Sequence, residues 1–318
     1  MKLFRTTLCA LTLAALLPGL AGAQNYPDKT MRLIVPAAPG GASDLLARIV
    51  AERLGQAMGQ PMIVDNRAGA SGGIGAQAVA KAAADGHTIL LGGQGANVLN
   101  MVMFPEMGLT TRDFAPVSLL ASGPLLLLVA PSAPFKTLPE LITAARAAPG
   151  KYSFASIGQG SAGHMAAEAL MAKTGIKLLH VPYKAGAQIF TDTMSGQVTM
   201  MFGIGVRNYI DDGRLRALGA TTLQRSAIAP DIPSFAESGV KDFEMDTWFG
   251  LFLPSATPAP IVRRLADETA KVVRAPDLAQ RLVNVGIVPR ASTPEQFDAM
   301  IAREIAMWTE VTRNMSRK

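Results

Sequence analysis

The chain has 318 residues and a formal net charge of +6, and its residues are 49% hydrophobic and 17% charged. This composition predicts a folded protein of about two domains and excludes a globally disordered chain. Aromatic residues make up only 6% and the basic residues form no long run, so we expect no nucleic-acid partner. A single Cys excludes an internal disulfide and a cysteine-based zinc site.

The first 23 residues have the pattern of a secretory signal peptide. Two basic residues come first, an apolar run spans 8–20, and residues 21–23 read Ala-Gly-Ala, as small-residue cleavage sites do. We expect cleavage after Ala23 and an exported, soluble product. A membrane anchor is the alternative, but the run is shorter than the roughly 20 residues that a span needs. Cys9 lies in this leader, so cleavage would leave a mature chain without cysteine.

The first part of the mature chain alternates strands and helices. Short apolar runs predict strands, and apolar residues at helical spacing predict helices. Because the strands are continuous apolar runs between helices, we expect a parallel sheet with helices on both faces. The strands are expected at 32–37, 61–64 and 88–91, and the helices at 44–58 and 73–84.

Two strands within 114–131 lead into a second unit, where the pattern restarts. An apolar stretch at 243–253 then returns the chain to the first unit. We therefore predict a signal peptide at 1–23, lobe 1 from 24–122 and 244–318, and lobe 2 from 123–243. The remaining helices are expected at 139–147, 162–173, 187–194, 259–273, 276–285 and 294–315, and the remaining strands at 152–157, 177–183, 198–202 and 215–221.

Three glycine-rich loops precede helices, at 39–44 (PGGASD), 70–73 (ASGG) and 156–161 (SIGQGS). The first amides of a helix have no intrahelical partner and the helix dipole is positive there, so such loops can bind an anion. Loops from both lobes could hold one small anion between them. The alternative is ordinary capping, with Ser43 as the N-cap and Asp44 offsetting the dipole. Asp44 would suit a ligand with an ammonium group better than an anion.

One segment matches two sequence motifs of enzymes, but the surrounding sequence lacks the features that these enzymes need. Residues 69–75 (GASGGIG) resemble the cofactor loop of short-chain dehydrogenases and the G-x-S-x-G elbow of hydrolases. The loop does not follow the first strand, and no Tyr has a Lys four residues on. His87 and His180 flank strands and are expected to be structural, whereas His164 follows the loop of lobe 2 and is a candidate for the cleft. We expect no enzyme, no metal and no cofactor.

Segments along nearly the whole mature chain resemble one family in composition and order. They include RLIVP at 32–36, DNR at 65–67, FAPV at 114–117, HVPYK at 180–184 and WFG at 248–250. The family is that of the Bug-type periplasmic substrate-binding proteins of tripartite tricarboxylate transporters. The resemblance implies an α/β, type II-like clamshell of two lobes, each with a mostly parallel sheet flanked by helices.

The resemblance also implies a function. We expect a periplasmic monomer that closes on a small carboxylate by a hinge at the strands between the lobes and then docks on membrane transporter subunits. Two alternatives stay open: a sensor that feeds a signalling receptor, and an exported enzyme that acts on a carboxylate.

In this family the ligand carboxylate is held largely by backbone amides and ordered waters, with little use of Arg or Lys. Carried over by position, the resemblance implies contacts from both lobes. The contacts would be Gly40, Gly41, Ser43, Ser71, Gly72, Ser156, Gly160 and Ser161, with Pro39, Asp44, Gly73, Gln94, Gly158, His164 and Tyr183 as further candidates.

Three positions depart from the pattern of the family. Ala37 stands where Phe is usual, Gly203 where Asp is common, and His87 where Tyr is usual. With Ala37 and Gly203 at the pocket, we expect a wider and less polar wall. This favours a larger or partly aromatic acid over a compact amino acid such as aspartate.

Overall fold

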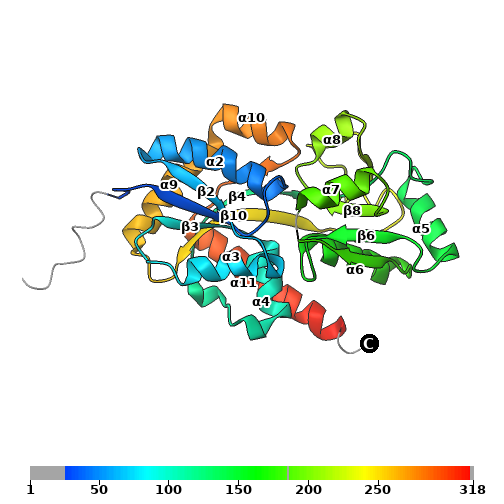
Figure 1. Ribbon diagram of the computed structural model, residues 1–318, viewed down its shortest axis with the longest axis horizontal. Coiled ribbons are helices and arrows are strands. Elements are labelled where there is room, and N and C mark those ends of the chain that lie inside the picture. Colours follow the sequence, from blue (N-terminus) through cyan, green and yellow to red (C-terminus); the bar gives the residue numbers. More distant parts are fainter. Residues whose placement is uncertain (1–25, 185, 316–318) are drawn as a thin grey trace, which may run out of the picture.

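The computed structural model describes residues 26–184 and 186–315, so the expected signal peptide lies outside the described residues. Two α/β lobes lie side by side, with lobe 1 on the left and lobe 2 on the right of Figure 1. Lobe 1 contains a six-stranded sheet of order β11-β4-β10-β3-β1-β2, and lobe 2 a five-stranded sheet of order β7-β6-β8-β5-β9. The predicted two-lobed α/β fold is confirmed.

Lobe 1 begins with three strands that pair in parallel. β1 packs between helices and is buried at four of its five positions, which explains its continuous apolar sequence MRLIV. The strands are β1 (Met31–Val35), β2 (Met62–Asn66) and β3 (Thr88–Gly93), and the helices that follow them are α2 (Ala42–Met58), α3 (Gly73–Ala80) and α4 (Asn100–Met103). Single turns lie at η2 (Ala70–Gly72), η3 (Gly95–Leu99), η4 (Pro105–Met107) and η5 (Thr111–Asp113).

Lobe 2 repeats this arrangement around β6, which pairs in parallel with β7 and β8. β5 pairs with β8 and β9 in the antiparallel direction. The strands are β5 (Leu126–Val129), β6 (Ser153–Ser156), β7 (Leu179–Pro182), β8 (Met200–Gly203) and β9 (Arg216–Ala220), and the helices are α5 (Leu138–Ala147), α6 (Ala162–Thr174), α7 (Gly186–Met194) and α8 (Arg207–Asp211).

Two neighbouring strands, β4 (Phe114–Pro124) and β10 (Asp246–Pro254), carry the chain between the lobes and run antiparallel to each other. Only Leu125 separates β4 from β5. Because β10 returns from lobe 2, it is also antiparallel to β3. β1 to β4 thus share one direction, and β6 to β9 share one direction in lobe 2. The lobe bounds expected at residues 123 and 244 fall close to these passages and stay a prediction.

Several short elements escape the sequence pattern. α2 begins at Ala42 and not at Asp44, with Gly41 as its N-cap, so Ser43 is not the N-cap. The turns at 95–103 form a π-helix and a short helix where no periodic apolar pattern indicated one. α8 and the two-residue strand β11 (Val288–Pro289) were also not expected. These elements are too short to show a repeat of either period.

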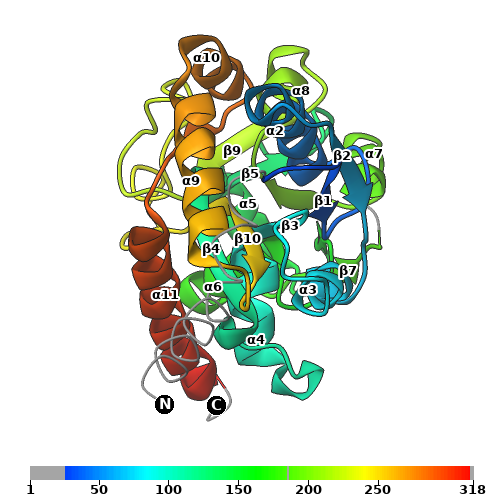
Figure 2. The same cartoon turned by 90° about the vertical axis from the view of Figure 1, so that its left-hand side faces the viewer.

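The C-terminal helices α9 (Ala259–Arg274), α10 (Pro276–Asn284) and α11 (Pro294–Met315) pack against the six-stranded sheet. Figure 2 shows α9 and α11 along one side of the molecule, next to β4 and β10. Phe297 of α11 packs against two rings of β10, with centroid separations of 5.3 Å to Trp248 and 5.0 Å to Phe252. Gly250 lies beneath this ring, and a Cβ there would overlap it and lie 3.0 Å from the carbonyl oxygen of Ser118.

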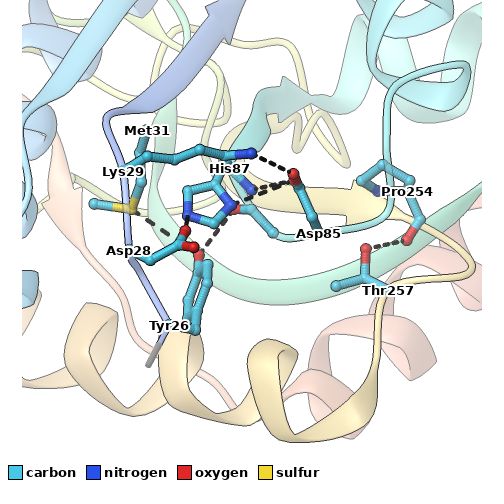
Figure 3. Close-up of polar contacts among 9 residues, drawn as sticks. Tyr26, Asp28, Lys29, Met31, Asp85, His87, Pro254 and Thr257 are labelled. Atoms are coloured by element: carbon cyan, nitrogen blue, oxygen red, sulfur yellow. Dashed lines mark hydrogen bonds and ion pairs between the residues drawn. The ribbon is translucent and has the colours of Figure 1, made fainter. Parts of the chain in front are cut away.

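His87 lies at the start of β3, at the opposite end of this strand from lobe 2. Figure 3 shows its ring between Asp28 and Asp85, with nitrogen–oxygen distances of 3.1 and 3.4 Å. Tyr26 packs edge-on against this ring and donates its hydroxyl to the carbonyl oxygen of Gly86 at 2.8 Å. His87 is therefore structural, and its departure from the family pattern does not shape the pocket.

The contact between β10 and α11 gives a stability prediction. Gly250→Ala places a methyl group in the ring of Phe297 and should lower the free energy of unfolding by about 1–3 kcal/mol, measured by urea denaturation. Phe297→Leu should lower stability less in the Gly250→Ala background than alone, because the smaller side chain relieves the overlap. Additive effects of the two substitutions would contradict this packing.

Candidate functional site

A cavity of about 190 Å³, here called the cleft cavity, lies where the two lobes face each other. Lobe 1 lines it with residues that follow β1 and β3, and lobe 2 with residues that follow β6 and β8. Leu125 and residues 247–249 of the crossing strands also line it. A wider hollow, the outer opening, adjoins it and includes Glu106, Tyr183 and Lys184. One buried water needs about 10–15 Å³, so the cleft cavity has room for a small organic molecule.

The lobes touch each other around the cleft cavity. The Ser71 hydroxyl of lobe 1 donates to the carbonyl oxygen of Gln159 in lobe 2, with an oxygen–oxygen distance of 2.6 Å. A Cβ on Gly40 would lie 3.5 Å from the Cβ of Ala187, and one on Gly95 would lie 3.8 Å from the Cα of Ser161. The two lobes are therefore in direct contact at the rim of the cleft cavity.

The N-terminus of α2 supplies polar groups from lobe 1. Gly41 is the N-cap and offers no side chain to the first turn, so the amides of Ala42 and Ser43 have no acceptor within the described part of the chain. Both residues line the cleft cavity. Just behind them, the Asp44 carboxylate accepts bonds from the Gly40 amide at 3.1 Å and from Arg48 at 3.0 Å.

The N-terminus of α6 faces the same cavity from lobe 2. The Ser161 hydroxyl accepts a bond from the His164 amide at 3.4 Å and donates to the carbonyl oxygen of Gly158 at 2.7 Å. The amides of Ala162 and Gly163 have no acceptor among residues 26–184 and 186–315, and both residues line the cavity. Two positive helix ends from opposite lobes therefore meet at one cavity.

The described wall of the cleft cavity contains no Asp, Glu, Lys, Arg or His. Its polar groups are backbone amides and carbonyls, the Ser and Thr hydroxyls, the Gln94 amide and the indole N–H of Trp248. No cluster of three or more His, Cys, Asp or Glu that could hold a metal occurs in the residues that the structure covers. An anion in this cavity would be bound by dipoles and not by a full opposite charge.

Much of the remaining wall is apolar, and sequence reasoning missed this part of the site. These residues carry no polar side chain that could signal a site, and only the WFG segment at 248–250 stood out, as a mark of the family. The apolar lining includes Leu91, Leu125, Ile189, Phe190, Met201, Phe202, Ile204, Trp248 and Phe249.

Most of the predicted contacts lie where two lobes meet. Those that line the cleft cavity are Ala37, Gly41, Ser43, Ser71, Gly72, Gln94, Ser156, Ser161 and Gly203. Gly158 and Tyr183 line only the outer opening, whereas Pro39, Gly40, Asp44, Gly73, Gly160 and His164 line neither hollow. A Cβ on Gly203 would point at Met201, Val206 and Leu128, so its lack of a side chain does not widen the cavity.

The residues outside the cavity have structural partners that explain their positions. The Gly40 amide and the Asp44 carboxylate bind each other, so Asp44 is not placed to meet a ligand ammonium group. The Gly160 amide donates to Nδ1 of His164 at 3.2 Å. Tyr183 donates its hydroxyl to Asp192 at 2.7 Å.

His164 packs inside lobe 2 and does not line the cleft, contrary to expectation. Its ring lies 4.5 Å from that of His180, and Phe154 stacks on His180 at 4.8 Å. Burial lowers the pKa of both histidines, and for His180 the neighbouring His164 lowers it further. Nε2 of His180 lies 2.7 Å from the Ser156 hydroxyl, so these rings support the loop at 156–161 from behind.

Gln94 lines the cleft cavity, but its amide nitrogen is already bonded. It donates to the Asp246 carbonyl oxygen at 3.3 Å and to Oε2 of Glu304 at 3.2 Å. Oε1 of Glu304 accepts the indole N–H of Trp248 at 2.9 Å. Burial raises the pKa of Glu304, the two hydrogen bonds oppose this shift, and the negative charge of Asp246 adds to it.

Comparison with known proteins agrees with this geometry. The family model described as "Tripartite tricarboxylate transporter family receptor" matches residues 46–316. A UPF0065 protein from the tcbD-tcbE intergenic region of Pseudomonas sp. (strain P51) is 39% identical over 290 residues, covering 90% of this chain and 86% of the relative. BugT of Bordetella pertussis is 33% identical over 300 residues, covering 93% and 92%. The chain belongs to the tripartite tricarboxylate transporter receptor family and is of the Bug type.

Solved structures share the whole fold. A periplasmic transporter superposes with a TM-score of 0.88 at 32% identity, covering 91% of this chain and 98% of that one. A protein from R. palustris solved with adipate gives 0.87 at 33% identity, covering 91% and 97%. MatC from Rhodopseudomonas palustris with bound malate gives 0.85 at 30% identity, covering 90% and 99%. In the part of this chain that the structure describes, no helix is long and apolar enough to cross a membrane.

The Asp44 contacts give a prediction for pH dependence. Burial alone would raise the pKa of Asp44, but hydrogen bonds from Arg48, the Gly40 amide and Asn66 lower it below its ordinary value of 3.8. Because the pKa of Asp44 is lower in the folded protein than in the unfolded chain, its ionised carboxylate stabilises the fold at pH values above the ordinary pKa. This stabilisation is lost as the pH falls through the lowered pKa. Asp44→Asn should therefore lower the free energy of unfolding by about 1–3 kcal/mol at pH 7, with a smaller difference from wild type at pH 3.

Urea denaturation at both pH values measures this difference. Asp267→Asn, at an exposed position of α9, is the control and should change little at either pH. An equal loss of stability for Asp44→Asn at pH 7 and pH 3 would contradict the assigned role.

Proposed function

We propose that this protein is an exported solute-binding protein that captures a small carboxylate in the cleft cavity and delivers it to the membrane subunits of a tripartite tricarboxylate-type transporter. One observation carries the proposal: the N-termini of α2 and α6 reach an uncharged cavity from opposite lobes. The relatives solved with adipate and malate support a carboxylate as the ligand.

Binding follows from the free amides. A carboxylate has two oxygens and can accept bonds from Ala42 and Ser43 on one side and from Ala162 and Gly163 on the other. A hydrogen bond to a charged group contributes about 1.5–3 kcal/mol, and each helix end adds about 0.3–1 kcal/mol. Waters can complete the coordination, because a bridging water is nearly as good as a direct bond.

Closure couples capture to delivery. A ligand that binds both lobes stabilises the closed state over the open one. The hinge lies at Leu125 and at the entry to β10, where the chain passes between the lobes. In the closed state the bond between Ser71 and Gln159 joins the two rims of the cleft. The membrane subunits would then recognise a surface composed of both lobes, which exists only when the lobes are together.

This mode of action involves no covalent step. The family and the expected signal peptide at 1–23 support a location in the periplasm. The family and its structural neighbours are substrate-binding proteins. Cleavage after Ala23 would leave Gln24 as the first residue of the mature chain.

Replacement of Ser43 tests the anion site without loss of the fold. Ser43→Asp places a carboxylate at the free amides of α2, and an acid in the first turn of a helix stabilises by about 0.3–1 kcal/mol. The same charge should repel a ligand carboxylate and weaken its binding by about a hundredfold or more. We therefore expect a higher melting temperature and lost binding in the same variant. Ser43→Asn, which has a similar shape and no charge, is the control and should bind within about tenfold of wild type.

A thermal-shift screen of aliphatic acids, aromatic acids and amino acids identifies the ligand. A ligand at a concentration of about 100 times its Kd stabilises the folded protein by about 2.7 kcal/mol, which raises the melting temperature. Calorimetry then compares the two variants. Binding of the same carboxylate by Ser43→Asp within threefold of wild type would refute the assignment of the cleft. Strong stabilisation by aspartate alone would refute the expectation of a larger acid.

Delivery is tested in cells that lack this protein. Uptake of the identified acid should be lost and should return with the wild-type chain but not with Ser43→Asp. Sequencing of the exported protein should start at Gln24. Undiminished uptake without the protein, while the membrane subunits are present, would contradict a role in transport.

A further inference from the structure

The loop at 158–161, here called the rim loop, is the part of lobe 2 that accepts the Ser71 hydroxyl of lobe 1. A Cβ on Gly158 would lie 2.9 Å from Oγ of Ser71, and a Cβ on Gly160 would lie 2.9 Å from the ring of Phe104. Both glycines have a positive φ, of 119° and 77°, which other residues rarely adopt. The rim loop therefore meets lobe 1 with its bare backbone, and the contact depends on the backbone conformation of the loop.

One histidine side chain holds the rim loop from within lobe 2. The Gly160 amide donates to Nδ1 of His164 at 3.2 Å, and His164 is only 7% exposed. Nδ1 can accept this bond only when it carries no proton. The ring is therefore neutral, with its single proton on Nε2, which lies 3.6 Å from Oε1 of Glu168.

Protonation of His164 is incompatible with this contact. A proton on Nδ1 would point at the N–H of Gly160, so two donors would face each other without an acceptor between them. Ser161 follows directly as the N-cap of α6, and the free amides of Ala162 and Gly163 come next. A displacement of the rim loop would therefore also move the donors that lobe 2 offers to the cleft cavity.

The charged groups around His164 determine when its ring takes up a proton. Glu168 on the same helix favours the protonated ring, whereas His180 of β7, whose ring centroid lies 4.5 Å away, disfavours a second positive charge. β6 and β8 pack against α6, and their sequences SFAS and MMFG contain no ionisable side chain. The residues of lobe 1 next to Gly160 are also uncharged, namely Asn100, Met103 and Phe104.

Burial lowers the pKa of His164 below its ordinary value of 6.5. A lowered histidine pKa means that the folded protein favours the neutral ring. The neutral ring contributes fully at pH values above 6.5, and its contribution is lost as the pH falls through the lowered pKa. The bond to Gly160 is therefore complete at neutral pH and is lost in acid.

We propose that His164 is a positioning residue of the binding cleft: its neutral ring holds the rim loop against lobe 1 and the start of α6 beside the cavity, and protonation releases both. The affinity for a ligand should then fall in acid, because only the unprotonated protein has the loop in place. This inference rests on the proposed function and adds regulation by pH to the same site.

Amide exchange followed by NMR tests the contact without any ligand. In the mature chain, between pH 7.5 and pH 4.5, the protection of the Gly160 amide, corrected for intrinsic exchange, should fall by about tenfold as the His164 ring titrates. His164→Asn is the matched variant, because Oδ1 of Asn can accept the same bond and does not titrate. Its Gly160 amide should stay protected throughout. Equal protection of this amide on both sides of the His164 titration would overturn the proposal.

Calorimetry with adipate and with malate, the acids of two solved relatives, measures the consequence for binding. The ratio of the wild-type affinity to that of His164→Asn should fall by about threefold or more as His164 titrates. This ratio cancels protonation of the acid itself, since both proteins bind the same acid. A constant ratio over the titration of His164 would overturn the proposal, and melting temperatures at each pH confirm that both proteins are folded.

A variant of the neighbouring histidine separates the two rings. His180→Gln keeps a polar group near the Ser156 hydroxyl, which lies 2.7 Å from Nε2 of His180, and removes the ionisable ring. The pH dependence of affinity should persist in this variant. Its loss would assign the effect to His180 and overturn the role of His164.

The same measurements separate this inference from the proposed function. If acids bind with a constant ratio, the inference fails and the proposed function stands. If no acid in the thermal-shift screen binds, while the Gly160 amide still follows the titration of His164, the proposed function fails and the role of His164 in holding the rim loop stands.

Discussion

The free backbone amides at the start of α2 and α6 are the interaction on which this protein depends. A helix start leaves donors without partners, and here the capping is arranged so that some of them stay free. Gly41 caps α2 without a side chain, while Ser161 caps α6 through the His164 amide only. The amides nearest the gap between the lobes remain available. The fold thus creates positive potential in a cavity without placing a charged side chain there.

This arrangement also explains why charged residues lie behind the loops and not in them. Asp44 binds the amide that precedes the turn and is itself paired with Arg48, so it shapes the loop without facing the cavity. His164 and His180 form a similar support in lobe 2, where burial favours their neutral forms. Fixed dipoles therefore face the cavity, and ionisable groups hold them in place.

The sequence predicted the long elements well because their apolar periods are clear. α11 has the predicted bounds, and the first strands and helices of each lobe were correct within a few residues. The loops with free amides could be found because Gly and Ser mark helix starts. The apolar wall could not, since Leu125 or Phe249 looks like any core residue until the strands that hold it are placed. The partners of Gly40 and Gly160 depend on local loop geometry, which residue type alone does not show.

The path of the chain between the two sheets has a consequence for folding. The sheet of lobe 1 requires β10 and β11, which follow all of lobe 2 in the sequence. The sheet of lobe 2 uses one continuous stretch, so it can assemble while lobe 1 is still incomplete. Pairings over such long separations form slowly. A newly made chain would therefore expose the unfilled edges of β3 and β4 for some time, and this interval is when it is most prone to aggregate.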